Sequence, residues 1–221
     1  MSFELHFGPV LAEFDRFVDG AILTMEFAAA SSAIGLVLAT GLAIGRVFGS
    51  APIRTLAACY IELIRNTPLL VQLYIVYFVL PKAGMRLDSN QAAIVALSLN
   101  LAAYAAEIIR AGLNAVPRGQ VEAGLSLGLR RGPIIRYIVL APAIRTIFPA
   151  LGSQFVLQIL GSSLVSAIAA EELTAVSNNV MMETFRNFEV FIVSGTLYLA
   201  MVLAFRLLFA AGDRALFRWT I

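Results

Sequence analysis

The sequence of 221 residues contains few of the side chains on which most catalytic and metal sites depend. Cys59 is its only cysteine and His6 its only histidine. One chain therefore has no cysteine pair for a disulfide and no Cys/His cluster for a zinc site. A single histidine ahead of the apolar segments also leaves those segments without a Ser-His-Asp triad. We expect no catalytic residue, no metal site and no cofactor in this chain.

Charged residues are also scarce. They make up 14% of the chain, whereas soluble domains have about 25% charged residues. Hydrophobic residues make up 60% of the chain, compared with about 45–50% in soluble domains. This composition excludes most soluble enzymes and the disordered classes. The net charge of +2 is too small to indicate a nucleic-acid partner. The composition instead predicts an integral membrane protein.

Apolar segments long enough to cross a membrane follow one another along the chain. A spanning helix needs about 20 apolar residues. We predict an all-α integral membrane protein with five transmembrane helices, at about 20–47, 52–80, 91–109, 147–170 and 190–209. At the end of the first span and just beyond it, Gly41, Gly45 and Gly49 form a row of small residues. Such a row permits close helix contact, or it reflects how common glycine is in membrane helices.

Two of these segments are irregular. Glu62 and Pro68 interrupt the apolar run in 52–80, and a proline removes a backbone donor and kinks a helix. We therefore predict one long bent helix there. Ahead of 147–170, prolines and arginines predict an interfacial helix, and two acidic residues follow the end of the span.

Lysine and arginine in the short loops predict the orientation. With the N-terminus outside, the inner side receives ten arginines, namely Arg46, Arg54, Arg110, Arg118, Arg130, Arg131, Arg136, Arg145, Arg214 and Arg218. The outer side receives only Arg16, Lys82, Arg86 and Arg186. We predict that residues 1–19 are periplasmic and residues 210–221 cytoplasmic. Acidic residues outnumber Arg16 before the first span, so we expect no cleavable signal sequence, which needs a basic N-terminal region.

The longest inner loop predicts a short cytoplasmic helix. Pro117 suits the first turn of a helix, and Gly132 followed by proline stops its continuation. Val121, Leu125 and Leu129 recur at i+4 spacing between them. A small helix with one apolar stripe fits a groove on another protein. The alternative is an amphipathic helix that lies on the bilayer.

The same loop carries a family motif. Glu122-Ala123-Gly124, Gly128 after three more residues and then Ile138-Val-Leu-Ala-Pro142 resemble the EAA signature of ABC-importer permeases. Gly124 replaces the second alanine of that signature, and the proline stands one position late. The resemblance implies a type I ABC importer permease, with a transmembrane type-1 domain over 20–209 and a cytoplasmic coupling helix between the third and fourth spans.

Further segments resemble the permeases for polar amino acids. These are Tyr60–Tyr74, Ala103–Gly112, Ser162–Ser166 and Glu172-Leu173-Thr174. The resemblance implies a bacterial inner-membrane importer whose periplasmic binding protein delivers a polar amino acid. It also implies a second permease chain, identical or paralogous, and two ATP-binding cassette subunits that bind ATP and Mg. This chain has no GxxxxGK[ST] phosphate loop, so the ATPase is a separate polypeptide.

The resemblance assigns the contact with the ATPase to the loop 114–133. The residues expected there are Val121, Glu122, Ala123, Gly124, Leu125 and Gly128. In this interpretation the two glycines let the short helix approach an ATPase groove, while Val121 and Leu125 are apolar anchors. Glu122 meets a basic or amide group of the ATPase, or stabilises the N-terminal end of the helix.

Polar residues inside the spans are candidates for the substrate pathway, because such residues are costly in a membrane. The candidates are Glu62, Arg65, Thr67, Gln72, Ser163, Ser166 and Glu172. A zwitterion needs donors for its carboxylate and acceptors for its ammonium group. Alternatively Glu62 pairs with Arg65, three residues away on one helical face, and the serines only pack helices. Glu107 and Arg110 have the same spacing and predict an interfacial pair.

A second function class fits the composition equally well. A stand-alone secondary carrier or channel would also be a helical membrane protein. Secondary carriers are commonly built from internal repeats, and this sequence has none. Nor would a carrier need the motif in the inner loop, so we predict a permease subunit rather than a carrier.

Overall fold

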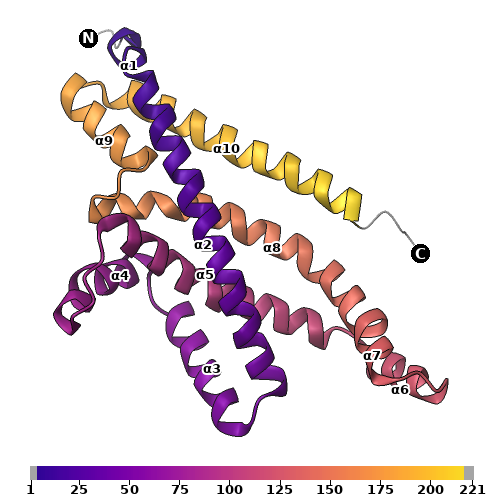
Figure 1. Cartoon of the computed structure of the whole chain (residues 1–221). Coiled ribbons are helices and arrows are strands. Elements are labelled where there is room, and N and C mark those ends of the chain that lie inside the picture. The colour runs from indigo at the N-terminus through magenta and orange to yellow at the C-terminus, as the bar shows by residue number, and fades with distance from the viewer. Residues whose placement is uncertain (1–3, 217–221) are drawn as a thin grey trace.

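The computed structural model describes residues 4–216, and within this range the chain is helical without any strand (Figure 1). The elements in chain order are α1 (Gly8–Leu11), α2 (Phe14–Phe48), α3 (Ala51–Arg65), α4 (Leu69–Tyr74), η1 (Ile75–Val79), η2 (Leu80–Ala83), α5 (Ser89–Asn114), α6 (Arg118–Ser126), α7 (Arg131–Pro133), η3 (Ile134–Leu140), α8 (Ala141–Gly161), η4 (Ser162–Ile168), α9 (Leu173–Thr184) and α10 (Asn187–Leu216). The predicted all-α class is confirmed.

Four helical segments in the described range are long and apolar enough to cross a membrane. They are Phe14–Phe48, Ser89–Asn114, Ile134–Ile168 and Asn187–Leu216. A fifth crossing requires that Ala51–Arg65 and Leu69–Ala83 count as one span, and these two pieces are bent by 108°. The prediction of one long bent helix over 52–80 is therefore wrong. Pro68 ends the helix instead of kinking it, because the residue before a proline is disfavoured in the helical conformation.

The fourth span is longer than predicted. Ile134–Ile168 runs without a break, so the expected separate interfacial helix is the first part of the span. A π-helical stretch, η3, precedes Pro142 in the first turn of α8. Such turns accommodate a missing backbone donor. Pro149 lies inside α8 without ending it.

The long helices α2 and α5 pack against each other at Gly35. A Cβ atom at Gly35 would lie 2.9 Å from Leu101 Cδ2 and 3.0 Å from the carbonyl oxygen of Ser98. Small residues allow this approach between membrane helices. The glycine row predicted from the sequence does not serve this contact, since Gly41 faces open space and Gly49 faces Ile53 across the turn into α3.

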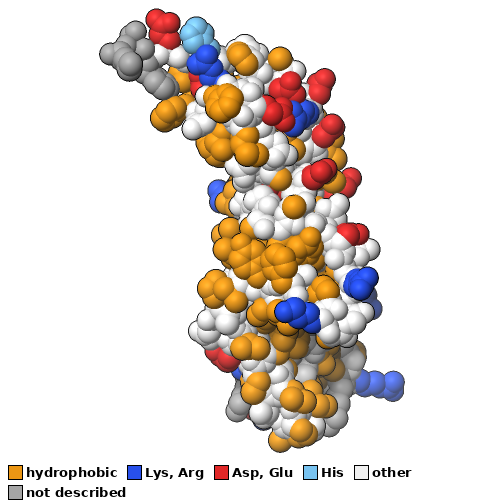
Figure 2. Space-filling view, turned by 90° about the vertical axis from the view of Figure 1, so that its left-hand side faces the viewer, with side chains coloured by type: hydrophobic (Ala, Val, Ile, Leu, Met, Phe, Trp, Pro, Cys, Tyr) orange, Lys and Arg blue, Asp and Glu red, His pale blue; other side chains and the backbone are white. Residues whose placement is uncertain are grey.

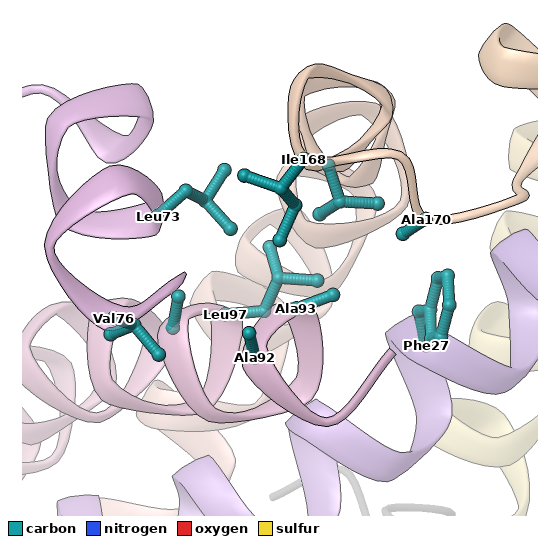
Figure 3. Close-up of a cluster of buried hydrophobic side chains, with 10 residues drawn as sticks. Phe27, Leu73, Val76, Ala92, Ala93, Leu97, Ile168 and Ala170 are labelled. Carbon is teal, nitrogen blue, oxygen red and sulfur yellow. The ribbon is translucent and has the colours of Figure 1, made fainter. Parts of the chain in front are cut away.

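A core of buried apolar side chains joins α4, α5 and η4 (Figure 3). Leu73 of α4 and Val76 of η1 belong to one buried cluster with Leu97 of α5 and Ile168 of η4. Buried apolar contact of this kind fixes the position of the broken span. On the outside, apolar side chains gather across the middle of one face, and acidic side chains gather toward the end that carries the N-terminus (Figure 2).

Candidate functional site

The break between α3 and α4 exposes polar backbone and side chains in the middle of a hydrophobic segment. Asn66 follows α3 as its C-cap, and Pro68 stands before α4 with an extended backbone. The Asn66 amide donates to the Glu62 carbonyl at 2.8 Å, and the Thr67 hydroxyl donates to the Leu63 carbonyl at 2.9 Å. These side chains satisfy carbonyl groups that a continuing helix would otherwise bind.

Gln72 fastens the break to the rest of the bundle. Its Nε2 lies 2.8 Å from the Ile64 carbonyl oxygen, 3.1 Å from the Thr67 carbonyl oxygen and 2.9 Å from the Thr67 hydroxyl. On the other side, Asn100 Nδ2 of α5 donates to Gln72 Oε1 at 3.0 Å. Gln72 is buried, and its hydrogen bonds join the end of α3 to α4 and α5. Asn100 was missed by sequence reasoning, although a lone asparagine within an apolar span is a recognisable signal.

Glu62 and Arg65 have separate partners in the structure, so the predicted ion pair between them is not formed. Asn66 Nδ2 donates to Glu62 Oε2 at 3.1 Å. The Arg65 guanidinium carbon lies 5.4 Å from the ring centre of Tyr104, a cation–π contact. Both charged side chains are exposed in this chain. The break therefore presents a positive and a negative group, each available to another ligand.

Ser163 and Ser166 lie on one face of η4, because a 3₁₀-helix repeats every three residues. Both are half-buried. Each hydroxyl donates to its own helix at 2.8 Å, to the carbonyls of Leu160 and Ser163. Since η4 packs against α4, the structure brings the serine helix next to the break.

Glu172 is the predicted pathway residue that the structure places apart. It is the N-cap of α9, where its Oε1 accepts the Ala175 amide at 2.9 Å. Its Oε2 accepts the Tyr198 hydroxyl of α10 at 2.6 Å. The side chain is fully buried. Burial raises the pKa of this carboxyl group, against the opposing effect of its hydrogen bonds.

The short helix α6 ends in a left-handed turn at Gly128, whose φ is +73°. The Gly128 amide donates to the Leu125 carbonyl at 2.9 Å, and the Leu129 amide donates to the Gly124 carbonyl at 3.1 Å. These two bonds define a Schellman motif, in which glycine is favoured because it has no Cβ. Gly128 thus has a backbone role in ending α6, while its approach to an ATPase groove stays a prediction.

Gly124 faces its own chain. A Cβ atom there would lie 2.7 Å from Ile138 Cδ1, so this glycine seats α6 on η3. Val121 is half-buried, and together with Val139 of η3 it lines a cavity of about 320 Å³. The outward edge of α6 carries Glu122, Ala123 and Leu125.

The apolar edge continues beyond α6. Leu125 is 53% exposed and Leu127 is 80% exposed. Sequence reasoning missed Leu127, because it does not belong to the i+4 stripe. With α7, this segment lies at the end of the molecule far from the N-terminus (Figure 1). An exposed leucine edge there is suited to contact with another protein.

The fold and the two sites define a multi-pass helical membrane protein with a polar break in one hydrophobic segment and an exposed apolar edge on a short helix. The chain belongs to the family of binding-protein-dependent transport system inner membrane components, whose model matches residues 31–218. The prediction of an ABC-importer permease is thereby confirmed, and a stand-alone carrier is not favoured. Membership in this family implies an ATPase and a binding protein as partners.

Characterised relatives cover most of the chain. The arginine transport system permease protein ArtQ of Bacillus subtilis (strain 168) is 33% identical over 213 residues, which are 96% of this chain and 97% of that protein. The glutamine transport system permease protein GlnP of Escherichia coli (strain K12) is 36% identical and covers 84% of this chain and 86% of its own length. The octopine transport system permease protein OccM of Rhizobium meliloti is 39% identical over 82% of this chain and 78% of its own.

A solved structure shares the fold. The chain superposes on an amino acid ABC transporter crystallised with histidines with a TM-score of 0.89 at 36% identity, over 96% of this chain and 100% of that chain. The MetNI methionine ABC transporter, in an inward-facing conformation, gives a TM-score of 0.76 at 20% identity, over 92% of this chain and 97% of that chain. This second likeness concerns the fold alone.

Proposed function

We propose that this chain is the permease subunit of an ATP-driven importer of polar amino acids in the bacterial inner membrane. It forms half of the translocation pathway with a second permease chain, identical or paralogous. A periplasmic binding protein delivers the amino acid, and two ATP-binding cassette subunits, which bind ATP and Mg, drive alternating access. The observation that carries the proposal is the polar break in the second span, in a chain related over most of its length to arginine, glutamine and octopine permeases.

The break offers both halves of a zwitterion a partner. The exposed guanidinium of Arg65 receives the α-carboxylate, and the exposed carboxylate of Glu62 receives the ammonium group. The hydroxyl groups of Thr67, Ser163 and Ser166 complete the lining from the break and from η4. Gln72 positions the helices around this site, and Glu172 joins α9 to α10 away from it. Neither touches the substrate, because both are buried and hydrogen-bonded within the chain.

The ATPase docks on the outward edge of α6. Leu125 and Leu127 are the apolar anchors, with Glu122 and Ala123 beside them, while Val121, Gly124 and Gly128 hold this edge in place. The N-terminus is periplasmic and the C-terminus cytoplasmic, so α6 faces the cytoplasm. A cysteine at Glu4, in a chain with Cys59→Ala, should react with an impermeant thiol reagent added to intact cells. Reaction only after the cells are opened would reverse this orientation.

The substrate site is tested with Arg65→Ala. A hydrogen bond to a charged group contributes about 1.5–3 kcal/mol, so we expect amino-acid uptake at limiting substrate to fall by about tenfold or more. Arg86→Ala is the matched control, because it removes an exposed arginine outside the break. Uptake is measured in vesicles that contain the complete transporter and its binding protein. Equal uptake by the two variants would remove Arg65 from the substrate pathway.

A further inference from the structure

A cavity of about 510 Å³ lies where the end of α2 meets the start of α3 and the end of α5. Its lining includes Arg46, Arg54, Thr55, Cys59, Arg110 and Asn114. This volume is typical of small-molecule sites, which occupy about 300–1,000 Å³. The turn from α2 to α3 stands at the end of the molecule away from the N-terminus (Figure 1). The cavity is separate from the polar break and from the edge of α6.

The positive charge of this cavity is only partly balanced. Arg110 Nη2 lies 2.6 Å from Glu107 Oε2, which confirms the pair predicted from the sequence. Arg46 Nη1 lies 3.9 Å from Glu107 Oε1, too far for a hydrogen bond. No acidic side chain is among the described residues that line the cavity. The Glu107 carboxylate, which is not part of the lining, therefore makes a close ion pair with only one of the three arginines that line the cavity.

Arg46 carries an unused donor. Its Nη1 atom is buried, and within residues 4–216 it has no hydrogen-bond partner. Because solvent does not reach this Nη1 atom, a ligand in the cavity would meet the accessible part of the Arg46 side chain, whose positive charge is shared with the Glu107 carboxylate. A guanidinium group is well matched to the oxygens of a phosphate.

Arg54 stands at the mouth of the same cavity. It is exposed, and its Nη2 donates to the Gly49 carbonyl at 3.3 Å. Two exposed apolar residues of α3 lie close to it in sequence. Ile53 is 52% exposed and Leu56 is 71% exposed. An arginine flanked by exposed apolar side chains at the end of a membrane helix fits a lipid headgroup with its acyl chains alongside.

We propose that this arginine cavity binds a phosphate group, supplied by an anionic phospholipid of the adjacent leaflet. The phosphate accepts from Arg54 and lies beside the positive charge of Arg46, and the acyl chains lie along Ile53 and Leu56. The site holds α2, α3 and α5 together at this end of the bundle. The proposal is independent of which amino acid is transported.

Cys59 reports on occupancy of the cavity, because it is the only cysteine, is exposed and lines the site. The purified full-length chain is placed in phosphatidylcholine nanodiscs with increasing phosphatidylglycerol, and the reaction of Cys59 with a small neutral maleimide is timed. We expect the reaction to slow as phosphatidylglycerol rises. Each arginine near an anionic lipid contributes about fivefold in affinity. Arg54→Gln should therefore need about five times as much phosphatidylglycerol for half-protection.

Two further variants complete the test. Arg46→Gln with Arg54→Gln should shift half-protection by about 30-fold, whereas Arg214→Gln, an exposed arginine on α10, should leave it unchanged. Inorganic phosphate is added to phosphatidylcholine discs in a separate arm. Protection there supports the phosphate site and assigns it to the free ion in place of the lipid. A reaction rate that does not change with phosphatidylglycerol, or protection that survives in the double variant, would overturn the proposal.

Discussion

A Gly128→Leu chain is expected to insert in the membrane and pair with its partner permease, yet to lose most ATP-driven uptake. The reason is the backbone of the Schellman turn, where φ is +73°. A left-handed conformation costs a residue with a Cβ roughly 1–2 kcal/mol, which is about a five- to thirtyfold change in an equilibrium. The turn that presents Leu125 and Leu127 would then reorganise. Co-purification of the ATPase with the permease measures the loss.

The matched control for this variant is Gly128→Asn. Asparagine tolerates the left-handed conformation better than other residues with a side chain, and space around Gly128 is open. We expect Gly128→Asn to recruit the ATPase nearly as the unaltered chain does. If Gly128→Leu also recruits a normal amount of ATPase and transports at the normal rate, the α6 segment is not the docking element.

Gln72→Leu should both destabilise the protein and stop transport. Leucine keeps most of the volume but cannot donate to the carbonyls of Ile64 and Thr67, and it leaves Asn100 Nδ2 without its acceptor. Buried polar groups left unpaired cost about 1–3 kcal/mol. The melting temperature should fall by several degrees, at about 2–4 °C for each kcal/mol in a chain of this size.

Gln154→Leu is the corresponding control, since Gln154 is half-buried in α8 and outside the break. Thermal unfolding in detergent and uptake in vesicles are measured for both variants. We expect Gln154→Leu to retain transport. A Gln72→Leu chain with unchanged melting temperature and uptake would show that the hydrogen bonds of Gln72 with α3 and α5 have no part in the mechanism.

Much of the fold could be predicted because a membrane imposes a simple rule on the sequence. Apolar length alone identifies the long spans, and Pro117 together with Gly132 locates the short helix α6. The position of the break at Pro68 could be predicted from the sequence, but the angle between the two helical pieces could not. The angle depends on contacts from distant residues, such as Asn100 with Gln72 and Leu97 with Leu73.

The direction in which a side chain points was the least predictable feature. Gly124 and Gly128 belong to one motif, yet the first packs on Ile138 and the second ends a helix. Spacing cannot separate these roles, because both require a residue without a side chain. Likewise, α2 and α5 approach each other closely at Gly35 and not at the more regular glycine row that begins at Gly41. The reason is that α5 crosses α2 at Gly35.

The most direct test of the central claim is amino-acid uptake into vesicles that contain this chain, its partner permease, the ATPase subunits and the binding protein. With a panel of polar amino acids, uptake of at least one should require ATP inside the compartment that faces α6, and should be absent without the binding protein. Uptake by this chain alone, driven by a gradient and unaffected by ATP, would contradict the account.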